Sequence, residues 1–133
     1  MPQPKKSAVG RPVPAPPLQI LLVEDHADTL KMLTRLLESM GFKVACAAAL
    51  SEALALGDQQ RFDLLICDLV LADGSGLELV VHLKKRGPIK SIALSGYGTD
   101  DERQRSFEAG FDRHLTKPVE LSAIQAAITE LCG

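Results

Sequence analysis

The sequence predicts an α/β fold in which helices cover both faces of a parallel sheet. Short, uniformly apolar segments alternate along the chain with longer segments whose apolar residues recur every three or four positions. The short segments lack the apolar–polar alternation of a half-exposed strand, which is expected when a strand is buried on both faces. Alternating patterns of this kind are typical of repeated β-α units.

Five segments are predicted to be strands. Each is rich in aliphatic residues and is bounded by polar residues, glycine or proline, which favour turns. The predicted strands are residues 20–23, 42–46, 64–67, 88–94 and 111–115.

Five helices are predicted between and after these strands. Two of them begin with the spacing of a capping box, in which a serine or threonine is followed three residues later by a glutamate: Ser75 with Glu78, and Thr99 with Glu102. Glycines mark two of the helix ends. The predicted helices are residues 30–40, 50–56, 76–85, a helix that opens at Thr99 and ends before Gly110, and one whose inner stripe spans 121–131.

Right-handed crossovers in so short a chain favour the flavodoxin-like (βα)5 arrangement, a doubly wound parallel sheet with strand order 2-1-3-4-5. The chain has 133 residues, of which 46% are apolar and only 4% aromatic. This composition is sufficient for one core, built from aliphatic side chains. Residues 19–133 are therefore expected to form one domain.

Residues 1–18 differ in amino-acid composition from the rest of the chain. They contain six prolines and no aliphatic periodicity, so we expect a flexible Pro-rich linker. A plain tether is favoured over a ligand for SH3-type modules.

Charge and hydropathy exclude several classes of partner. The first 18 residues carry three basic and no acidic side chains, which leaves 12 basic against 17 acidic side chains in residues 19–133. An acidic domain is a poor binder of phosphate backbones, so direct nucleic-acid binding is not expected. The chain has neither an apolar run of about 18 residues nor a signal peptide, so we expect a cytoplasmic protein without membrane contact by this segment.

The three cysteines predict neither a disulfide framework nor a zinc site, because Cys46, Cys67 and Cys132 show no C-x-x-C spacing. Cys46 and Cys67 lie in apolar segments and are expected to be small buried residues.

Polar residues follow four of the predicted strands where each strand ends. Glu24 and Asp25 follow the first strand, Asp68 the third, Ser95 the fourth, and Lys117 lies near the end of the fifth. In the order 2-1-3-4-5 these four strands are neighbours. The second strand along the chain lies at the outer edge and contributes no such residue. Ligands of doubly wound sheets bind at this edge of the sheet.

Three carboxylates at one edge repel each other by about 4 kcal/mol per close pair at an effective dielectric constant of 20, and Lys117 supplies only one positive charge. Mg²⁺ resolves this repulsion, because it prefers oxygen ligands and uses one or two carboxylates with waters and phosphate oxygens. Asp25 and Asp68 are the predicted direct ligands, and Glu24 is expected to act through water. The alternative is that all three are solvated loop acids.

The remaining groups favour phosphoryl transfer. An aspartate can attack phosphorus to form an acyl phosphate. Its transition state needs neutralisation of charge and in-line positioning more than acid–base help. Mg²⁺, the Lys117 ammonium and the Ser95 hydroxyl would supply this set, with Asp68 as the nucleophile.

The motifs at these positions resemble those of receiver domains of two-component response regulators, over residues 19–131. A single motif of this kind is weakly specific, whereas the ordered set is strongly so. The motifs are LLVED (21–25), LLICDLVLADGSG (64–76), IALSGYG (92–98) and HLTKP (114–118).

The resemblance implies a role for each site residue. Asp68 would accept a phosphoryl group from the phosphohistidine of a histidine kinase or a histidine phosphotransfer protein. Glu24 and Asp25 would form the acidic pocket for Mg²⁺, and the backbone carbonyl of Val70 would be a further metal ligand.

Ser95 would be the hydroxyl residue of the conformational switch, and Lys117 would contact the phosphoryl group. In this family the peptide bond between Lys117 and Pro118 is often cis.

The chain departs from the family pattern at two positions. Ala72 stands where the family often has proline, which predicts a looser loop after Asp68. His114 occupies the switch position that is usually Tyr or Phe. Two orientations stay open for His114, either turned inward or left in solvent. Of the other histidines, His26 is expected to face solvent rather than bind metal, and His82 to lie on the surface.

The segments SGYGTDD and FEAGFDRHLTKPV are similar to C-terminal receivers of hybrid histidine kinases, and a stand-alone response regulator is the alternative. Two other classes compete with the receiver. A phosphatase of the haloacid dehalogenase type would need a second acid two residues after the nucleophile, where Val70 lies. A docking module without phosphorylation would not need the full set of site residues. We therefore expect no enzymatic activity beyond self-phosphorylation and autodephosphorylation.

Overall fold

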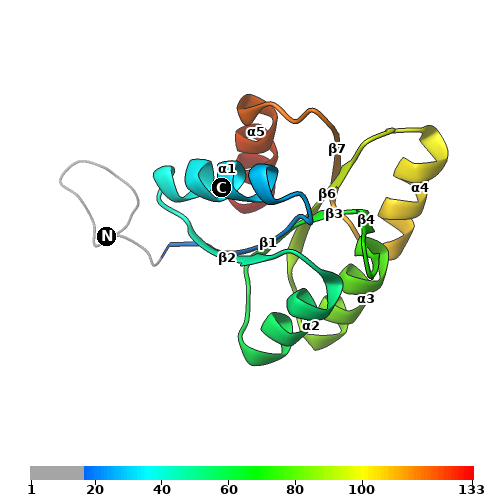
Figure 1. Ribbon diagram of the computed structural model, residues 1–133, viewed down its shortest axis with the longest axis horizontal. Helices are drawn as coiled ribbons and strands as arrows, with labels where there is room; N and C mark the ends of the chain where they lie inside the picture. Colours follow the sequence, from blue (N-terminus) through cyan, green and yellow to red (C-terminus); the bar gives the residue numbers. More distant parts are fainter. Residues whose placement is uncertain (1–16) are drawn as a thin grey trace, which may run out of the picture.

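A five-stranded parallel sheet runs through the middle of the molecule in the computed structural model, which describes residues 17–133 (Figure 1). Its strand order is β2-β1-β3-β6-β7, with every neighbouring pair parallel. Counted along the chain without the short hairpin β4–β5, this is the predicted order 2-1-3-4-5. The sheet strands are β1 (Gln19–Val23), β2 (Lys43–Ala47), β3 (Leu64–Asp68), β6 (Lys90–Ser95) and β7 (Arg113–Thr116).

The sheet separates two apolar clusters because successive side chains of a strand point to opposite faces. Leu21 and Leu65 belong to one cluster, whereas Leu22 and Ile66 belong to the other. All five residues of β3 are buried, as predicted for a strand covered on both faces. The core is aliphatic apart from Phe62, Phe111 and Cys67.

Helices cover both faces of the sheet. Helices α1 and α5 lie on one face, and α2 and α3 lie on the other, with α4 beside α3 (Figure 1). Among residues 17–133, no helix combines the length and the apolar character needed to cross a membrane. The helices are α1 (Ala27–Ser39), α2 (Leu50–Gln59), α3 (Gly76–Arg86), α4 (Asp100–Ala109) and α5 (Leu121–Cys132).

The two predicted capping boxes have different outcomes. At the start of α3 both halves form, because Ser75 Oγ accepts the N–H of Leu77 and the Glu78 carboxylate accepts the N–H of Ser75. At the start of α4, Thr99 Oγ1 accepts the N–H of Glu102 at 3.1 Å, but the Glu102 carboxylate accepts the N–H of Gly98 instead. Only the first is a complete box.

The segment after β3 forms a hairpin that the sequence analysis did not predict. Strands β4 (Val70–Leu71) and β5 (Gly74–Ser75) pair antiparallel. The loop that was expected to be looser, because residue 72 is not proline, is thus closed by strand pairing. Gly76 then starts α3 directly against β3, and a Cβ atom at this position would overlap the carbonyl oxygen of Asp68.

Burial corrects one of the predictions for cysteine. Cys67 is buried as expected, but Cys46 is exposed, because it lies on the edge strand β2, whose residues are mostly only partly covered. The domain also starts slightly earlier than predicted. Leu18 packs against the core and its carbonyl accepts the N–H of Lys43, whereas residues 1–16 of the predicted linker lie outside the described residues.

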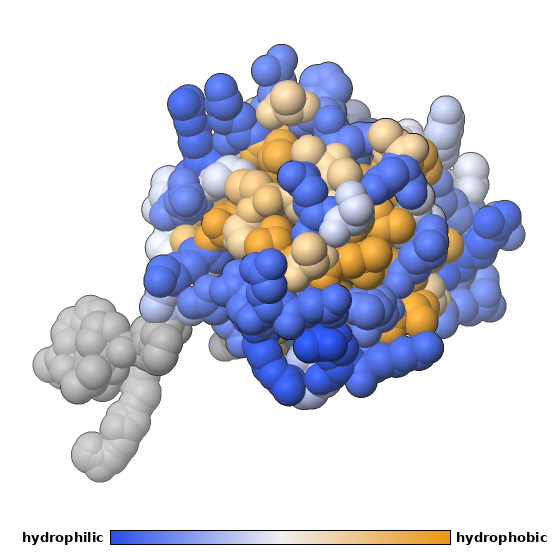
Figure 2. Space-filling view, turned by 60° about the horizontal axis from the view of Figure 1, so that its bottom comes forward, coloured by the Kyte–Doolittle hydropathy of each residue, from blue (hydrophilic) through white to orange (hydrophobic). Residues whose placement is uncertain are grey.

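The side formed by α2 and α3 exposes an apolar area surrounded by hydrophilic residues (Figure 2). Val81 contributes to the apolar surface of α3, and 40% of this residue is exposed. Exposed aliphatic residues of this kind are normal on protein surfaces.

Candidate functional site

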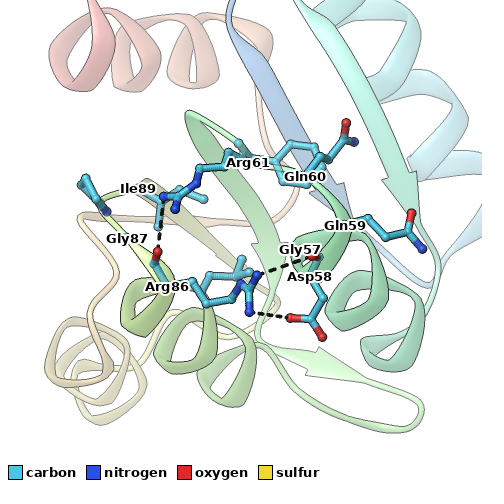
Figure 3. A pocket seen from close by; sticks show the side chains of 11 residues that line it. Gly57, Asp58, Gln59, Gln60, Arg61, Arg86, Gly87 and Ile89 are labelled. Atoms are coloured by element: carbon cyan, nitrogen blue, oxygen red, sulfur yellow. Dashed lines mark hydrogen bonds and ion pairs between the residues drawn. The ribbon is translucent and has the colours of Figure 1, made fainter.

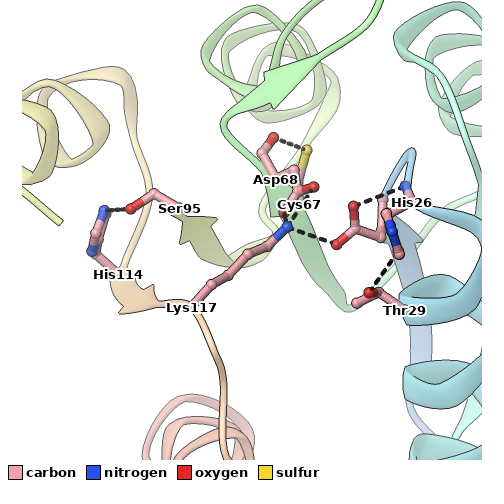
Figure 4. Close-up of polar contacts among 8 residues, drawn as sticks. His26, Thr29, Cys67, Asp68, Ser95, His114 and Lys117 are labelled. Atoms are coloured by element: carbon pink, nitrogen blue, oxygen red, sulfur yellow. Dashed lines mark hydrogen bonds and ion pairs between the residues drawn. The ribbon is translucent and has the colours of Figure 1, made fainter. Parts of the chain in front are cut away.

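The predicted site residues lie at the carboxyl edge of the sheet, where Asp68, Ser95 and Lys117 can be followed in Figure 4. Glu24 and Asp25 follow β1, Asp68 ends β3, Ser95 ends β6 and Lys117 follows β7. Parallel pairing brings these ends to one edge, since Val23 is in register with Cys67 and Asp68 with Leu94. The side chains of segments that lie up to 93 residues apart are thereby in direct contact.

Three carboxylates cluster at this edge. One oxygen each from Glu24, Asp25 and Asp68 lies within 4.8 Å of the other two. Glu24 is fully buried, Asp68 is 4% exposed, and Asp25 is open to solvent. The cluster therefore has a buried base and one accessible side, which suits a cation that enters from solvent with part of its water shell.

Glu24 is held by protein groups on both carboxylate oxygens. Oε1 accepts a hydrogen bond from Lys117 Nζ at 2.8 Å, and Oε2 accepts the backbone N–H of His26 at 3.1 Å. Burial alone would raise the pKa of Glu24. The hydrogen bonds with Asp68, Lys117 and His26 outweigh burial and lower this pKa. Glu24 is thus an ionised partner of Lys117, a contact that the sequence analysis did not predict.

The pKa of Asp68 is shifted in the opposite direction from that of Glu24. Burial first, and then the neighbouring Glu24 carboxylate, raise the pKa of Asp68 to about 8, although Lys117 acts to lower it. Lys117 Nζ lies 2.8 Å from Oδ1 and 3.0 Å from Oδ2 of Asp68. Only the contact with Oδ2 has hydrogen-bond geometry, so Oδ1 is buried without a hydrogen-bond partner among the described residues.

This geometry fits the predicted magnesium site. A buried carboxylate oxygen without a hydrogen bond is costly, and a hard cation would both satisfy it and favour the ionised form of Asp68. The clustered donors are all carboxylate oxygens, the ligand type that Mg²⁺ prefers. Val70 lies in β4, two residues beyond Asp68, and the role of its carbonyl as a ligand stays a prediction.

Lys117 is fixed from both ends. Its backbone N–H donates to the carbonyl of Ser95 at 2.7 Å, and its ammonium lies between Glu24 and Asp68. Burial acts to lower the pKa of Lys117, but the two carboxylates outweigh burial and raise it. The side chain is therefore an ammonium throughout the physiological range. The peptide bond between Lys117 and Pro118 is cis, as the resemblance predicted.

His114 is turned inward, so the solvated alternative is wrong for this structure. Its side chain is fully buried, and Nε2 lies 3.0 Å from Ser95 Oγ (Figure 4). Burial and the nearby Arg103 lower the pKa of His114, although Glu102, whose Oε1 is 3.9 Å from Nε2, acts to raise it. The result is a neutral imidazole in contact with the Ser95 hydroxyl.

The other two histidines lie outside the site, as expected. His26 is exposed and its Nδ1 lies 3.1 Å from Thr29 Oγ1. In the described part of the chain, it is not among the clustered metal-ligating groups. His82 pairs with Asp58 at 3.0 Å, between α3 and α2.

One hollow lies beside these groups, and another lies away from them. An apolar groove of about 400 Å³ lies beside Lys117, lined by α1 and by Pro118 and Val119. A second cleft, of about 200 Å³, lies between the ends of α2 and α3 (Figure 3). The second cleft is lined by residues that precede β3 and β6, so it lies at the edge of the sheet away from the carboxylates. Its Arg86 is paired with Asp58, and we assign no site there.

Comparisons with known proteins agree with this geometry. The family model of the response regulator receiver domain matches residues 20–129. PilR of Pseudomonas aeruginosa, a response regulator protein, is 34% identical over 81% of this chain and 24% of its own length. An uncharacterised 14.6 kDa protein of Leptolyngbya boryana is 33% identical over 86% of this chain and 90% of its own length.

Solved structures show the same fold. A CheY-like receiver domain protein from Methanospirillum hungatei superposes with a TM-score of 0.82 at 32% identity, covering 86% of this chain and 93% of that one. A Burkholderia pseudomallei response regulator, solved with a phosphorylated aspartic acid, calcium and citrate, has a TM-score of 0.78 at 31% identity, covering 83% and 65%.

The share of each relative that is covered varies. The chain spans about half of the length of KdpE, a transcriptional regulatory protein of Escherichia coli, and a quarter of PilR, but 90% of the Leptolyngbya protein and 93% of the crystallised Methanospirillum chain. The segment matched by the family model, residues 20–129, contains the acidic cluster of this chain and almost all of its sheet. This chain belongs to the response regulator receiver domain family of two-component signalling.

Proposed function

We propose that Asp68 accepts a phosphoryl group from the phosphohistidine of a histidine kinase or a histidine phosphotransfer protein, in a reaction that depends on Mg²⁺. The observation that carries this proposal is the buried Oδ1 of Asp68, which has no hydrogen-bond partner among the described residues while Lys117 Nζ lies 2.8 Å away. An oxygen that is shielded from water and faces a fixed ammonium is suited to attack an electrophilic phosphorus.

The chain's own residues divide the work of the transfer. A bond forms between a carboxylate oxygen of Asp68 and phosphorus as the bond between phosphorus and the donor imidazole nitrogen breaks, and the imidazole leaves with the bonding electrons. Lys117 neutralises charge on the phosphoryl oxygens, and Glu24 holds its ammonium in place. Burial excludes water from Asp68, which strengthens each of these interactions.

Asp25, Asp68 and the carbonyl of Val70 would hold Mg²⁺ directly, with Glu24 acting through water. When bound, the ion supplies positive charge for the phosphoryl oxygens and keeps Asp68 ionised. Support comes from the three clustered carboxylates and from the Burkholderia relative, whose crystal contained a calcium ion and a phosphorylated aspartic acid.

Ser95 and His114 form the proposed switch. In this structure the Ser95 hydroxyl contacts His114 Nε2 at 3.0 Å. A phosphoryl group on Asp68 would offer this hydroxyl charged acceptor oxygens, which form stronger hydrogen bonds than a neutral imidazole. The loss of its serine partner would free His114 to repack, and this change on β6 and β7 would be the signal.

For the wider context, we propose the C-terminal receiver of a hybrid histidine kinase in the cytoplasm, because the segments around Tyr97 and Phe111 are similar to such receivers. A stand-alone response regulator is the second candidate, favoured by the single-domain relatives that the chain spans almost completely. In either context the chain carries no enzymatic activity beyond its own phosphorylation and dephosphorylation.

Intact mass measurement tests the proposal directly. The protein is incubated with Mg²⁺ and acetyl phosphate, and a gain of about 80 Da, one phosphoryl group, is expected. Asp68→Asn should abolish the gain, whereas the exposed-acid control Asp28→Asn should keep it. Turnover of the phosphodonor without a stable adduct would indicate a phosphatase. No adduct and no turnover would indicate a docking module.

A further inference from the structure

Helix α2 begins at a residue that provides no side-chain cap. Its N-cap residue is Ala49, which cannot accept a hydrogen bond through its side chain. The first N–H groups of a helix have no partner within the helix, and they require an acceptor from elsewhere.

Asp73 supplies that acceptor from another part of the chain. Its Oδ1 accepts the N–H of Leu50 at 2.7 Å and its Oδ2 accepts the N–H of Ser51 at 3.0 Å. These are the first two residues of α2, and they lie 23 and 22 residues before Asp73. The hydrogen bonds from Ser51 and Leu50 lower the pKa of Asp73, as expected for a carboxylate at the positive end of a helix.

Asp73 lies at the turn of the β4–β5 hairpin, which begins two residues after Asp68. The neighbouring Gly74 packs so closely on Leu50 that a Cβ atom at position 74 would overlap the leucine side chain. The tip of the hairpin is therefore both hydrogen-bonded to α2 and packed against it. The other end of the hairpin is fixed, because the Leu69 N–H donates to the carbonyl of Leu94 at 2.9 Å.

The segment between these two fixed ends carries a predicted metal ligand, the carbonyl of Val70. Mg²⁺ demands near-ideal octahedral geometry, so a backbone ligand must be held in place before the ion arrives. Residue 72 is alanine, so no proline ring restricts the backbone of the turn. A tie between the hairpin tip and α2 would provide the restriction instead.

We propose that Asp73 is a positioning residue for the metal site, which fixes the β4–β5 hairpin against the first turn of α2. Asp73 would act through the backbone of residues 69–72 and would contact neither the ion nor the phosphoryl group. This inference rests on the proposed function, since it concerns the Mg²⁺ site of the receiver. The competing explanation is that Asp73 serves only to cap α2.

Glu52 provides a matched control that separates the two explanations. Its Oε1 accepts the N–H of Ala48 at 2.7 Å, so it also stabilises the start of α2. Both Asp73→Ala and Glu52→Ala remove an exposed carboxylate that accepts backbone N–H groups at the same end of the same helix. Only Asp73→Ala releases the hairpin.

The experiment is a Mg²⁺ titration of the full chain, followed by NMR amide shifts, for wild type, Asp73→Ala, Asp73→Asn and Glu52→Ala. Loss of an outer partner of a metal site weakens metal binding by about tenfold or more, so we expect the Mg²⁺ Kd of Asp73→Ala to rise by about tenfold. Glu52→Ala should stay within about twofold of wild type, although its melting temperature falls. Asp73→Asn keeps one acceptor oxygen and should lie in between.

Three outcomes would overturn the inference. An unchanged Kd in Asp73→Ala would show that the hairpin needs no tie. An equal rise in Glu52→Ala would show that the effect comes from α2 stability alone. If wild type itself fails to bind Mg²⁺, the proposed function fails and this inference fails with it, so the wild-type titration distinguishes the two failures.

Discussion

The raised pKa of Asp68 predicts that this buried carboxyl group destabilises the fold at neutral pH. In the folded chain this pKa is about 8, against an ordinary value of 3.8. Between these values the folded protein keeps a proton that the unfolded chain releases. The free energy of unfolding should therefore fall as pH rises from about 4 to about 8 and level off above that.

The magnitude follows from the same difference. Neutral pH lies about three pH units above the ordinary pKa of aspartate, and each unit corresponds to about 1.4 kcal/mol, which sets a ceiling of about 4 kcal/mol at pH 7. The lowered pKa of Glu24 offsets part of this cost. Asp68→Asn, which keeps the shape but cannot ionise, should thus raise the free energy of unfolding at pH 7 by less than this ceiling of about 4 kcal/mol.

Urea denaturation at pH 5, 7 and 8.5, with EDTA present to remove divalent cations, measures this effect. We expect the wild type to lose stability across the series and Asp68→Asn to lose much less, with equal dependence on urea in both proteins. Asp28→Asn, at an exposed position in α1, should follow the wild-type slope. Parallel pH profiles for wild type and Asp68→Asn, or a variant that is less stable at pH 7, would refute the reasoning.

Three further predictions concern other parts of the molecule. Mg²⁺ should raise the melting temperature according to RT ln(1 + [L]/Kd), and Asp25→Ala should remove most of that rise; a titration curve unchanged by the substitution would exclude Asp25 as a ligand. Because the pKa of His114 is lowered, stability should fall as pH decreases below about 6.5, by at most about 1.4 kcal/mol per pH unit. Denaturation of His114→Phe should show a flatter acid limb, and an unaltered limb would contradict the assignment. Ser75→Ala should cost about 1 kcal/mol in urea denaturation through loss of the α3 cap, and no measurable change would show that the capping box contributes nothing.

Much of the fold and the centre of the site could be predicted because they depend on local pattern and topology. Apolar runs and helical spacing predicted the strands and helices, and the preference for right-handed crossovers predicted the strand order. Parallel strands must then place their carboxyl ends at one edge of the sheet. Although the direct contact between Glu24 and Lys117 was not predicted, the common location of Glu24, Asp68 and Lys117 follows from that rule. The structure confirms it with contacts of 2.8 Å from the lysine to both carboxylates.

The remaining features depend on the placement of individual side chains. The inward orientation of His114 is a choice of rotamer that packing against Ser95 decides. Asp73 reaches a helix 23 residues earlier in the chain, and no periodicity marks such a contact. Cys46 is apolar in its sequence context but lies on the edge strand, and a strand pattern does not reveal which side of an edge strand lacks a cover.

The close approach of Gly76 to the carbonyl oxygen of Asp68 limits the routes by which the molecule can respond to its ligand. Helix α3 starts in contact with the backbone of Asp68. The start of this helix therefore cannot move closer to β3 without a steric clash. On the opposite side, Lys117 reaches Asp68 through its side chain, and Ser95 contacts His114 through its hydroxyl. These side chains can move without breaking the sheet. We therefore expect a change at Asp68 to alter the positions of side chains on β6 and β7, and we expect α2 and α3 to keep their positions.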